Sequence, residues 1–187
     1  MAQVAVFGTG TTGTRIAEVC AAAGTDVVLY DANIYATLSA IQRITAAHRP
    51  ATAPDERGGP GREDRFGRLT FAAGLSDVSG SDIVIEAVPE RLDLKVAVLR
   101  SVEDVTRPGT LLVTRTSALP ITNMATQLRD PRYLVGLNFF APAPITNLIE
   151  VVSTTFTPDV AWRAAIDFVE KTLGKVALNI ADQPTFC

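Results

Sequence analysis

Three glycines near the N-terminus, Gly8, Gly10 and Gly13, form a G-x-G-x-x-G pattern, and a carboxylate, Asp31, follows them. The first glycine permits a tight turn, the second lets the backbone approach a pyrophosphate, and the third lets a helix pack closely on a strand. A helix that begins at this turn directs free N–H groups and its positive dipole end toward phosphates. The residue types and spacing therefore predict a dinucleotide site, with Thr12 of the turn as a further cofactor-binding residue.

Asp31 defines which dinucleotide is expected. It stands 18 residues after Gly13 and ends a second apolar run, residues 27–30. A carboxylate at this place accepts hydrogen bonds from the adenosine ribose hydroxyls and repels a 2′-phosphate, which favours NAD over NADP. The alternative is a glycine turn in a βαβ unit that binds nothing.

Composition narrows the class of protein. Of the 187 residues, 47% are hydrophobic, and 17 basic against 20 acidic side chains give a net charge of −3. This balance argues against nucleic acid or an anionic membrane surface as a partner. We find no apolar run long enough for a membrane helix, no signal segment and no disulfide framework, and we expect no metal site. A cytoplasmic protein is predicted.

Strands alternate with helices along the chain, which predicts an α/β fold: a single Rossmann-type, doubly wound, mostly parallel sheet with helices on both faces, over residues 1–187. Residues 49–68 are rich in proline, glycine and charge and are predicted to form a flexible loop. Residues 133–152 leave no room for a crossover helix, so their two strands are expected to be antiparallel. Strands are predicted at 4–7, 27–30, 69–72, 82–87, 110–114, 133–139, 148–152 and 175–180, and helices at 11–23, 31–48, 92–105, 120–128 and 158–173.

Four segments together share the order and spacing of motifs found in one enzyme family. They are Gly8-Thr-Gly-Thr-Thr-Gly13, Ile85-Glu-Ala-Val-Pro-Glu90 with Lys95, Thr114-Arg-Thr-Ser-Ala-Leu119, and Gly136-Leu-Asn-Phe-Phe-Ala-Pro142 followed by Leu148-Ile-Glu150. In these segments the chain resembles the 3-hydroxyacyl-CoA dehydrogenases, over nearly its whole length and as their N-terminal NAD-binding domain. The resemblance implies the Rossmann fold, NAD as cofactor and an acyl thioester or related small molecule as substrate.

The resemblance also implies where catalysis takes place. In that family a histidine acts as general base, a glutamate orients it, and a serine lies near the substrate oxygen. By position the glutamate is Glu150 and the serine is Ser117, but the histidine position holds Asn138. An asparagine amide donates and accepts hydrogen bonds but takes up no proton at physiological pH. Loss of a general base typically lowers the rate by about 10²–10⁴.

Other residues also differ from the family's motifs on the substrate side of the predicted site. The family's Asn-Thr-Ser-Ser becomes Arg115-Thr-Ser-Ala, and we expect Arg115 to be able to bind a carboxylate of the substrate. Glu90 and Lys95, which the resemblance places near the nicotinamide ribose and the substrate, are retained. The alternative for these two residues is an exposed ion pair in the first turn of the 91–105 helix.

The family continues into an all-helical domain that forms the dimer and half of the substrate cleft. Here Asp182-Gln-Pro-Thr-Phe-Cys187 is similar to the segment that precedes that domain, and the sequence stops. We therefore expect a truncated relative whose open face is covered by a second copy of this chain or by a partner protein.

Two functions follow. The first is an NAD-dependent oxidoreductase acting on a 3-hydroxyacyl or 3-oxoacyl substrate with altered chemistry, in which Asn138 and Ser117 polarise the substrate oxygen and Glu150 reaches it through water. The second is a non-catalytic NAD-binding module, or a scaffold reused for a non-redox step with a partner protein. The missing histidine and the missing helical domain motivate the second hypothesis.

Overall fold

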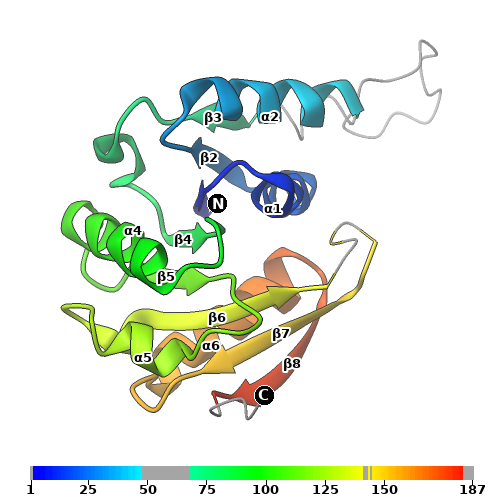
Figure 1. The fold of residues 1–187 in the computed structure, drawn as a ribbon. Coiled ribbons are helices and arrows are strands. Elements are labelled where there is room, and N and C mark those ends of the chain that lie inside the picture. The colour runs from blue at the N-terminus through cyan, green and yellow to red at the C-terminus, as the bar shows by residue number, and fades with distance from the viewer. Residues whose placement is uncertain (1, 48–67, 141–142, 144, 183–187) are drawn as a thin grey trace.

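The computed structural model describes residues 2–47, 68–140, 143 and 145–182. In this part of the chain, eight strands form one sheet in the order β3-β2-β1-β4-β5-β6-β7-β8 (Figure 1). The strands are β1 (Gln3–Phe7), β2 (Asp26–Tyr30), β3 (Leu69–Phe71), β4 (Ile83–Glu86), β5 (Leu111–Thr114), β6 (Leu134–Phe139), β7 (Leu148–Ser153) and β8 (Val176–Ala181). The helices are α1 (Thr11–Ala22), α2 (Ile34–Ala47), α4 (Leu92–Val105), α5 (Ile121–Ala125) and α6 (Asp159–Asp167).

Every neighbouring pair of strands is parallel except β6 and β7, which are antiparallel. The central strands β4 and β5 are buried along their whole length, as expected for parallel strands with helices on both faces. The predicted Rossmann-type fold is confirmed, including the antiparallel pair between residues 133 and 152.

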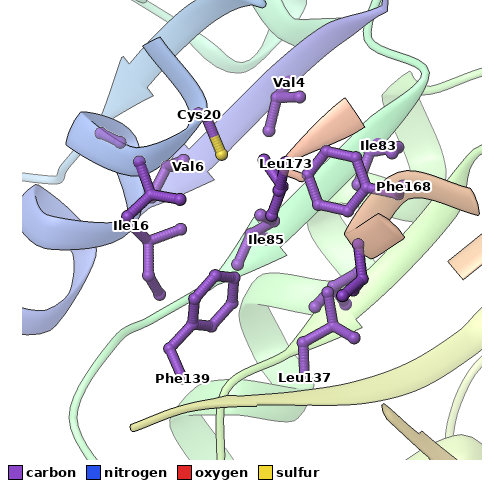
Figure 2. Close-up of a cluster of buried hydrophobic side chains, with 14 of the residues drawn as sticks. Val4, Val6, Ile16, Cys20, Ile83, Ile85, Leu137, Phe139, Phe168 and Leu173 are labelled. Carbon is purple, nitrogen blue, oxygen red and sulfur yellow. The ribbon is translucent and has the colours of Figure 1, made fainter. Parts of the chain in front are cut away.

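Helices cover the sheet on both faces. On one face α1 and α6 pack against alternate strand residues, among them Val4, Val6 and Phe139 (Figure 2). On the other face α4 and α5 pack against the remaining residues of the same strands. Cys20 of α1 lies in the first cluster, fully buried. Its burial raises the pKa of the thiol to about 12, so it remains protonated at neutral pH and acts as a small apolar side chain.

The sheet face that carries α4 and α5 continues onto β7 and β8. By register, Asn138, Glu150 and Leu178 share this face on three adjacent strands, with Val176 beside them. Val176 and Leu178 are 53% and 44% exposed. We call these four residues the open face.

Some element boundaries differ from the prediction. Helix α2 begins at Ile34 rather than at residue 31, because residues 31–33 form a turn in which Asn33 Oδ1 accepts a hydrogen bond from the Tyr35 N–H at 3.0 Å. The last helix changes into a π-helical segment, Phe168–Thr172. The predicted loop at 49–68 lies outside the described residues except for Arg68. Among the helices that the structure describes, none is both long and apolar enough to span a bilayer.

Candidate cofactor pocket and active site

The glycine turn lies between β1 and α1. Gly8 has a φ of 92°, and a Cβ at this residue would lie 2.8 Å from the Ala87 carbonyl oxygen. A Cβ on Gly13 would lie 1.8 Å from the carbonyl oxygen of Gly8, whereas one on Gly10 would meet no described atom within 4 Å. The turn is therefore packed tightly against β4 and α1 and is open on the side of Gly10. This is the shape that a backbone cradle for a pyrophosphate needs.

Asp31 is held at the end of β2 by the same turn. Its Oδ2 accepts hydrogen bonds from the Thr9 N–H at 2.8 Å and from the Thr9 hydroxyl at 3.0 Å. Its Oδ1 accepts one from the Asn33 N–H at 3.0 Å. Because a carboxylate oxygen has more than one lone pair, the side chain keeps capacity to accept from ribose hydroxyls.

We predict that Asp31→Asn lowers NAD affinity about tenfold and weakens discrimination against NADP, because the change removes a charge-assisted acceptor and the repulsion of a 2′-phosphate. Calorimetric titration of both proteins with each nucleotide measures the effect. Asp167→Asn, an exposed change of the same type on α6, is the matched control. Equal affinity of the unmodified chain for NAD and NADP would contradict the prediction.

A pocket of about 560 Å³ lies over the carboxyl ends of β1, β2, β4 and β5. It brings together six of the predicted site residues: Gly8, Gly10, Thr12, Asp31, Glu90 and Arg115. Gly13 is not among the lining residues but packs closely against Gly8, which is. The pocket sits where the chain order of the strands reverses, which is the place where open α/β sheets bind their ligands.

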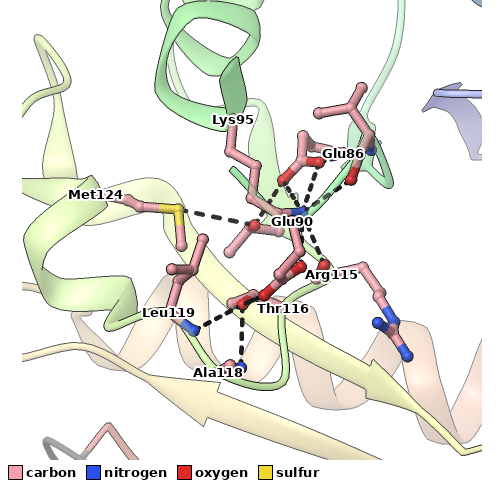
Figure 3. Close-up of polar contacts among 10 residues, drawn as sticks. Glu86, Glu90, Lys95, Arg115, Thr116, Ala118, Leu119 and Met124 are labelled. Carbon is pink, nitrogen blue, oxygen red and sulfur yellow. Dashed lines mark hydrogen bonds and ion pairs between the residues drawn. The ribbon is translucent and has the colours of Figure 1, made fainter. Parts of the chain in front are cut away.

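Lys95 is fully buried and contacts three residues that line this pocket, Val88, Glu90 and Arg115. Its Nζ donates hydrogen bonds to Glu86 Oε1 at 2.9 Å, to Glu86 Oε2 at 3.1 Å and to the carbonyl oxygens of Val88 and Arg115 (Figure 3). It also lies 3.5 Å from Glu90 Oε2. An exposed ion pair, the alternative considered from the sequence, is therefore wrong for Lys95. The structure gives Lys95 the role of fixing the loops that form the pocket wall.

Glu86 is the other half of this buried ion pair, and the sequence motifs predict no role for it. Its carboxylate accepts from Lys95, from the Thr114 hydroxyl at 2.7 Å and from the Val88 N–H at 2.7 Å. Burial raises the pKa of the Glu86 carboxyl, while the Lys95 ammonium and these hydrogen bonds act in the opposite direction. One sequence signal could have identified Glu86 as a buried ion-pair residue: it is the single acid at the end of an otherwise apolar strand, Ile83–Glu86.

Thr116 connects this network to the loop that carries Ser117. The Thr116 hydroxyl donates to Glu90 and accepts from the N–H groups of Ala118 at 3.3 Å and Leu119 at 2.9 Å. Ser117 itself is exposed. Among the described residues, no hydrogen bond joins it to Asn138 or Glu150.

Asn138 and Glu150 face each other across the antiparallel pair β6 and β7. Asn138 Nδ2 donates a hydrogen bond to Glu150 Oε2 at 2.9 Å. The structure therefore brings the two residues together as a pair, with both side chains half-buried on the open face. The pair offers an amide N–H, an amide oxygen and a carboxylate, and only the carboxylate can exchange a proton.

Comparison with known proteins agrees with this geometry. A family model described as "3-hydroxyacyl-CoA dehydrogenase, NAD binding domain" matches residues 3–183. The chain is 37% identical over 184 residues to a 3-hydroxyadipyl-CoA dehydrogenase of Escherichia coli. The aligned region covers 98% of this chain and 37% of that protein. It is 32% identical over 185 residues to a 3-hydroxybutyryl-CoA dehydrogenase of Mycobacterium tuberculosis, covering 98% and 65% of the two chains.

Solved structures show the same similarity. The crystal structure of a 3-hydroxybutyryl-CoA dehydrogenase from E. coli has a TM-score of 0.90 and 34% identity, over 99% of this chain and 39% of that one. The structure of M. tuberculosis FadB2 has a TM-score of 0.88 and 31% identity, over 96% and 64%. The chain thus spans less than two thirds of the length of these relatives.

Proposed function

Since the chain belongs to the 3-hydroxyacyl-CoA dehydrogenase family, as its NAD-binding domain, we propose that it is the cofactor-binding part of an NAD-dependent oxidoreductase with altered chemistry. The substrate we propose is a 3-hydroxyacyl or 3-oxoacyl thioester. One observation supports the proposal: a pocket lined by the glycine turn and Asp31 lies on the same sheet as the hydrogen-bonded pair Asn138 and Glu150, which the family resemblance places at the catalytic position.

The cofactor of the chain is NAD, and the residues present fit it. The glycine turn would hold the pyrophosphate, and Asp31 would accept from the adenosine ribose. When bound, the cofactor would supply the redox chemistry: NAD would accept a hydride from the alcohol, and NADH would donate one to the ketone. The protein groups must position the substrate and handle the proton of its oxygen.

Asn138 changes how that proton can be handled. When the thioester's 3-oxo group is reduced, its oxygen acquires negative charge and then a proton. The Asn138 amide N–H stabilises that charge as a fixed donor, and Ser117 supports it from the loop that follows β5. Glu150 relays the proton from solvent through a water molecule, because a carboxyl group, unlike an amide, can take up and release a proton. When the alcohol is oxidised, the Glu150 carboxylate takes the proton back through the same water molecule, because the two directions share one transition state.

A second function is supported by the same residues. Asn138 provides no base, and the open face exposes Val176 and Leu178. Exposed apolar side chains of this kind mark an interaction surface. The alternative proposal is therefore a non-catalytic NAD-binding module. Its open face would be covered by a second copy of this chain or by a partner protein.

The decisive prediction concerns NAD binding. We expect the chain to bind NAD and Gly10→Asp to weaken binding more than about tenfold, because a carboxylate would enter the phosphate cradle. Gly10 has open space around it, so the variant should keep its fold. Calorimetric titration, with the unfolding temperature of both proteins as control, measures this. Absence of NAD binding by the unmodified chain would remove the basis of both proposed functions.

Turnover separates the two functions. Protein at high concentration is mixed with NADH and acetoacetyl-CoA, and the nicotinamide absorbance is followed. Turnover above background that depends on Asn138 supports the oxidoreductase. NAD binding without turnover supports the module.

A further inference from the structure

Arg115 is held rigidly at the start of the loop that follows β5. Its N–H donates to the Glu86 carbonyl oxygen at 2.8 Å, and its own carbonyl oxygen accepts from Lys95 Nζ at 2.9 Å. Both partners belong to the buried ion pair. The backbone of Arg115 is therefore fixed by the core of the protein rather than by the exposed part of its loop.

The guanidinium group, in contrast, makes no hydrogen bond or ion pair with the part of the chain that the structure describes. Its Nε is buried and has no hydrogen-bond acceptor among the described residues. No described carboxylate lies within ion-pair distance of it, and Glu90 on the same pocket wall is already engaged by Thr116 and Lys95. Figure 3 shows the Arg115 side chain leaving the cluster around Glu86 and Glu90. A buried donor without an acceptor is unfavourable, so the arrangement is incomplete without a ligand.

The side chain lines the cofactor pocket. Along the sheet, β2, β1, β4 and β5 are neighbours in that order, so Asp31 and Arg115 are three strands apart, or about 14 Å. The glycine turn at the end of β1 lies between them. Arg115 therefore lies at the end of the pocket away from the adenosine ribose that Asp31 is proposed to bind.

We infer that Arg115 binds an oxyanion of a ligand in this end of the pocket, through Nε and a terminal guanidinium nitrogen. A guanidinium presents two parallel N–H groups that match the two oxygens of a phosphate or a carboxylate. Two sources can supply this group: the phosphate on the nicotinamide side of the cofactor, or a carboxylate on the substrate. The inference deepens the proposed function and rests on it, since it concerns a ligand of the same pocket.

Arg115→Gln tests the inference and identifies the source. Calorimetric titrations of the full chain use AMP, nicotinamide mononucleotide and NAD, and then malonate added to protein saturated with NAD. If the oxyanion is the cofactor phosphate, Arg115→Gln lowers the affinity for nicotinamide mononucleotide and for NAD at least about tenfold. Its affinity for AMP stays unchanged. If the oxyanion is a substrate carboxylate, the variant binds the three nucleotides with normal affinity but no longer binds malonate.

Arg100→Gln, the same change at an exposed residue of α4, is the matched control and should bind all four probes normally. Arg115→Lys keeps the charge without the paired N–H groups and should recover only part of the affinity, so a folding defect in one variant does not decide the result. Unchanged binding of every probe in Arg115→Gln, with NAD bound by the unmodified chain, overturns this inference and leaves the proposed function intact. If the unmodified chain binds neither nucleotides nor malonate, both fail.

Discussion

Replacing Asn138 with histidine is expected to raise the turnover of a 3-hydroxyacyl or 3-oxoacyl thioester by about 10²–10⁴, the range that general acid–base catalysis contributes. The Asn138 amide already donates to Glu150 Oε2 at 2.9 Å. An imidazole at the same place on β6 can make that hydrogen bond with one ring nitrogen and use the other to exchange a proton with the substrate oxygen. The carboxylate would also stabilise the imidazolium form.

The gain should depend on Glu150. In the double variant Asn138→His with Glu150→Gln, the amide fixes the ring poorly and does not stabilise its charge, so most of the gain should vanish. Initial rates with NAD and a 3-hydroxybutyryl thioester, and with NADH and acetoacetyl-CoA, measure both directions. Equal rates for Asn138→His and the unmodified chain would show that the substrate is not brought to this pair, and would favour the non-catalytic module.

Replacing Lys95 with methionine is expected to lower the free energy of unfolding by about 3–5 kcal/mol, the usual effect of removing one partner of a buried ion pair. The side chains of Lys95 and Glu86 are both 0% exposed, and the ammonium nitrogen lies 2.9 Å from Glu86 Oε1. The change leaves the Glu86 carboxylate buried without its cationic partner, with only the Thr114 hydroxyl and the Val88 N–H as donors among the described residues. It also releases the carbonyl oxygens of Val88 and Arg115.

Denaturant unfolding of Lys95→Met, beside the exposed control Lys171→Met, measures the effect. Lys171 pairs with Asp167 on the surface, and its loss should change the free energy of unfolding by less than about 1 kcal/mol. In the double variant Glu86→Gln with Lys95→Met, much of the loss should be recovered, because no buried charge remains. A Lys95→Met protein as stable as the control would show that the pair contributes little.

The loss should also depend on pH. Burial raises the pKa of the Glu86 carboxyl above its ordinary value of 4.5, and in Lys95→Met the ammonium no longer opposes this shift. The folded variant then holds its proton more tightly than the unfolded chain does, so its stability falls as the pH rises from about 4.5 through the raised pKa. Lys95→Met should therefore be less destabilised at pH 5 than at pH 8.

The geometry of the glycine turn and of Asp31 was predictable because its constraints are local. Gly8, Gly10 and Gly13 are required by backbone geometry within one turn, and Asp31 ends the next strand of the same βαβ unit. Such requirements appear in the sequence as residue types at a fixed spacing. The strands were predictable for a similar reason, since parallel strands buried on both faces are continuous apolar runs.

The pairing of Asn138 with Glu150 depends instead on the register of two strands. The residues alone do not fix that register, and only the resemblance to a family with a histidine–glutamate pair suggested it. The burial of Lys95 was not predictable from its place in the first turns of a helix, which is usually solvated. It follows from the packing of α4 over Glu86, a contact made between separate elements.

The order of the strands has a consequence for folding cooperativity. In the described sheet, each strand pairs with its neighbour in the chain except at one place, where β1 pairs with β4. The pocket spans the β1–β4 pair. Gly8 and Asp31 belong to the part of the chain that contains β1–β3, and Glu90 and Arg115 belong to the part that contains β4–β8. A ligand that contacts both sides stabilises them only when they are together, by about 2.7 kcal/mol at a concentration of 100 Kd. NAD therefore couples the unfolding of β1–β3 to that of β4–β8.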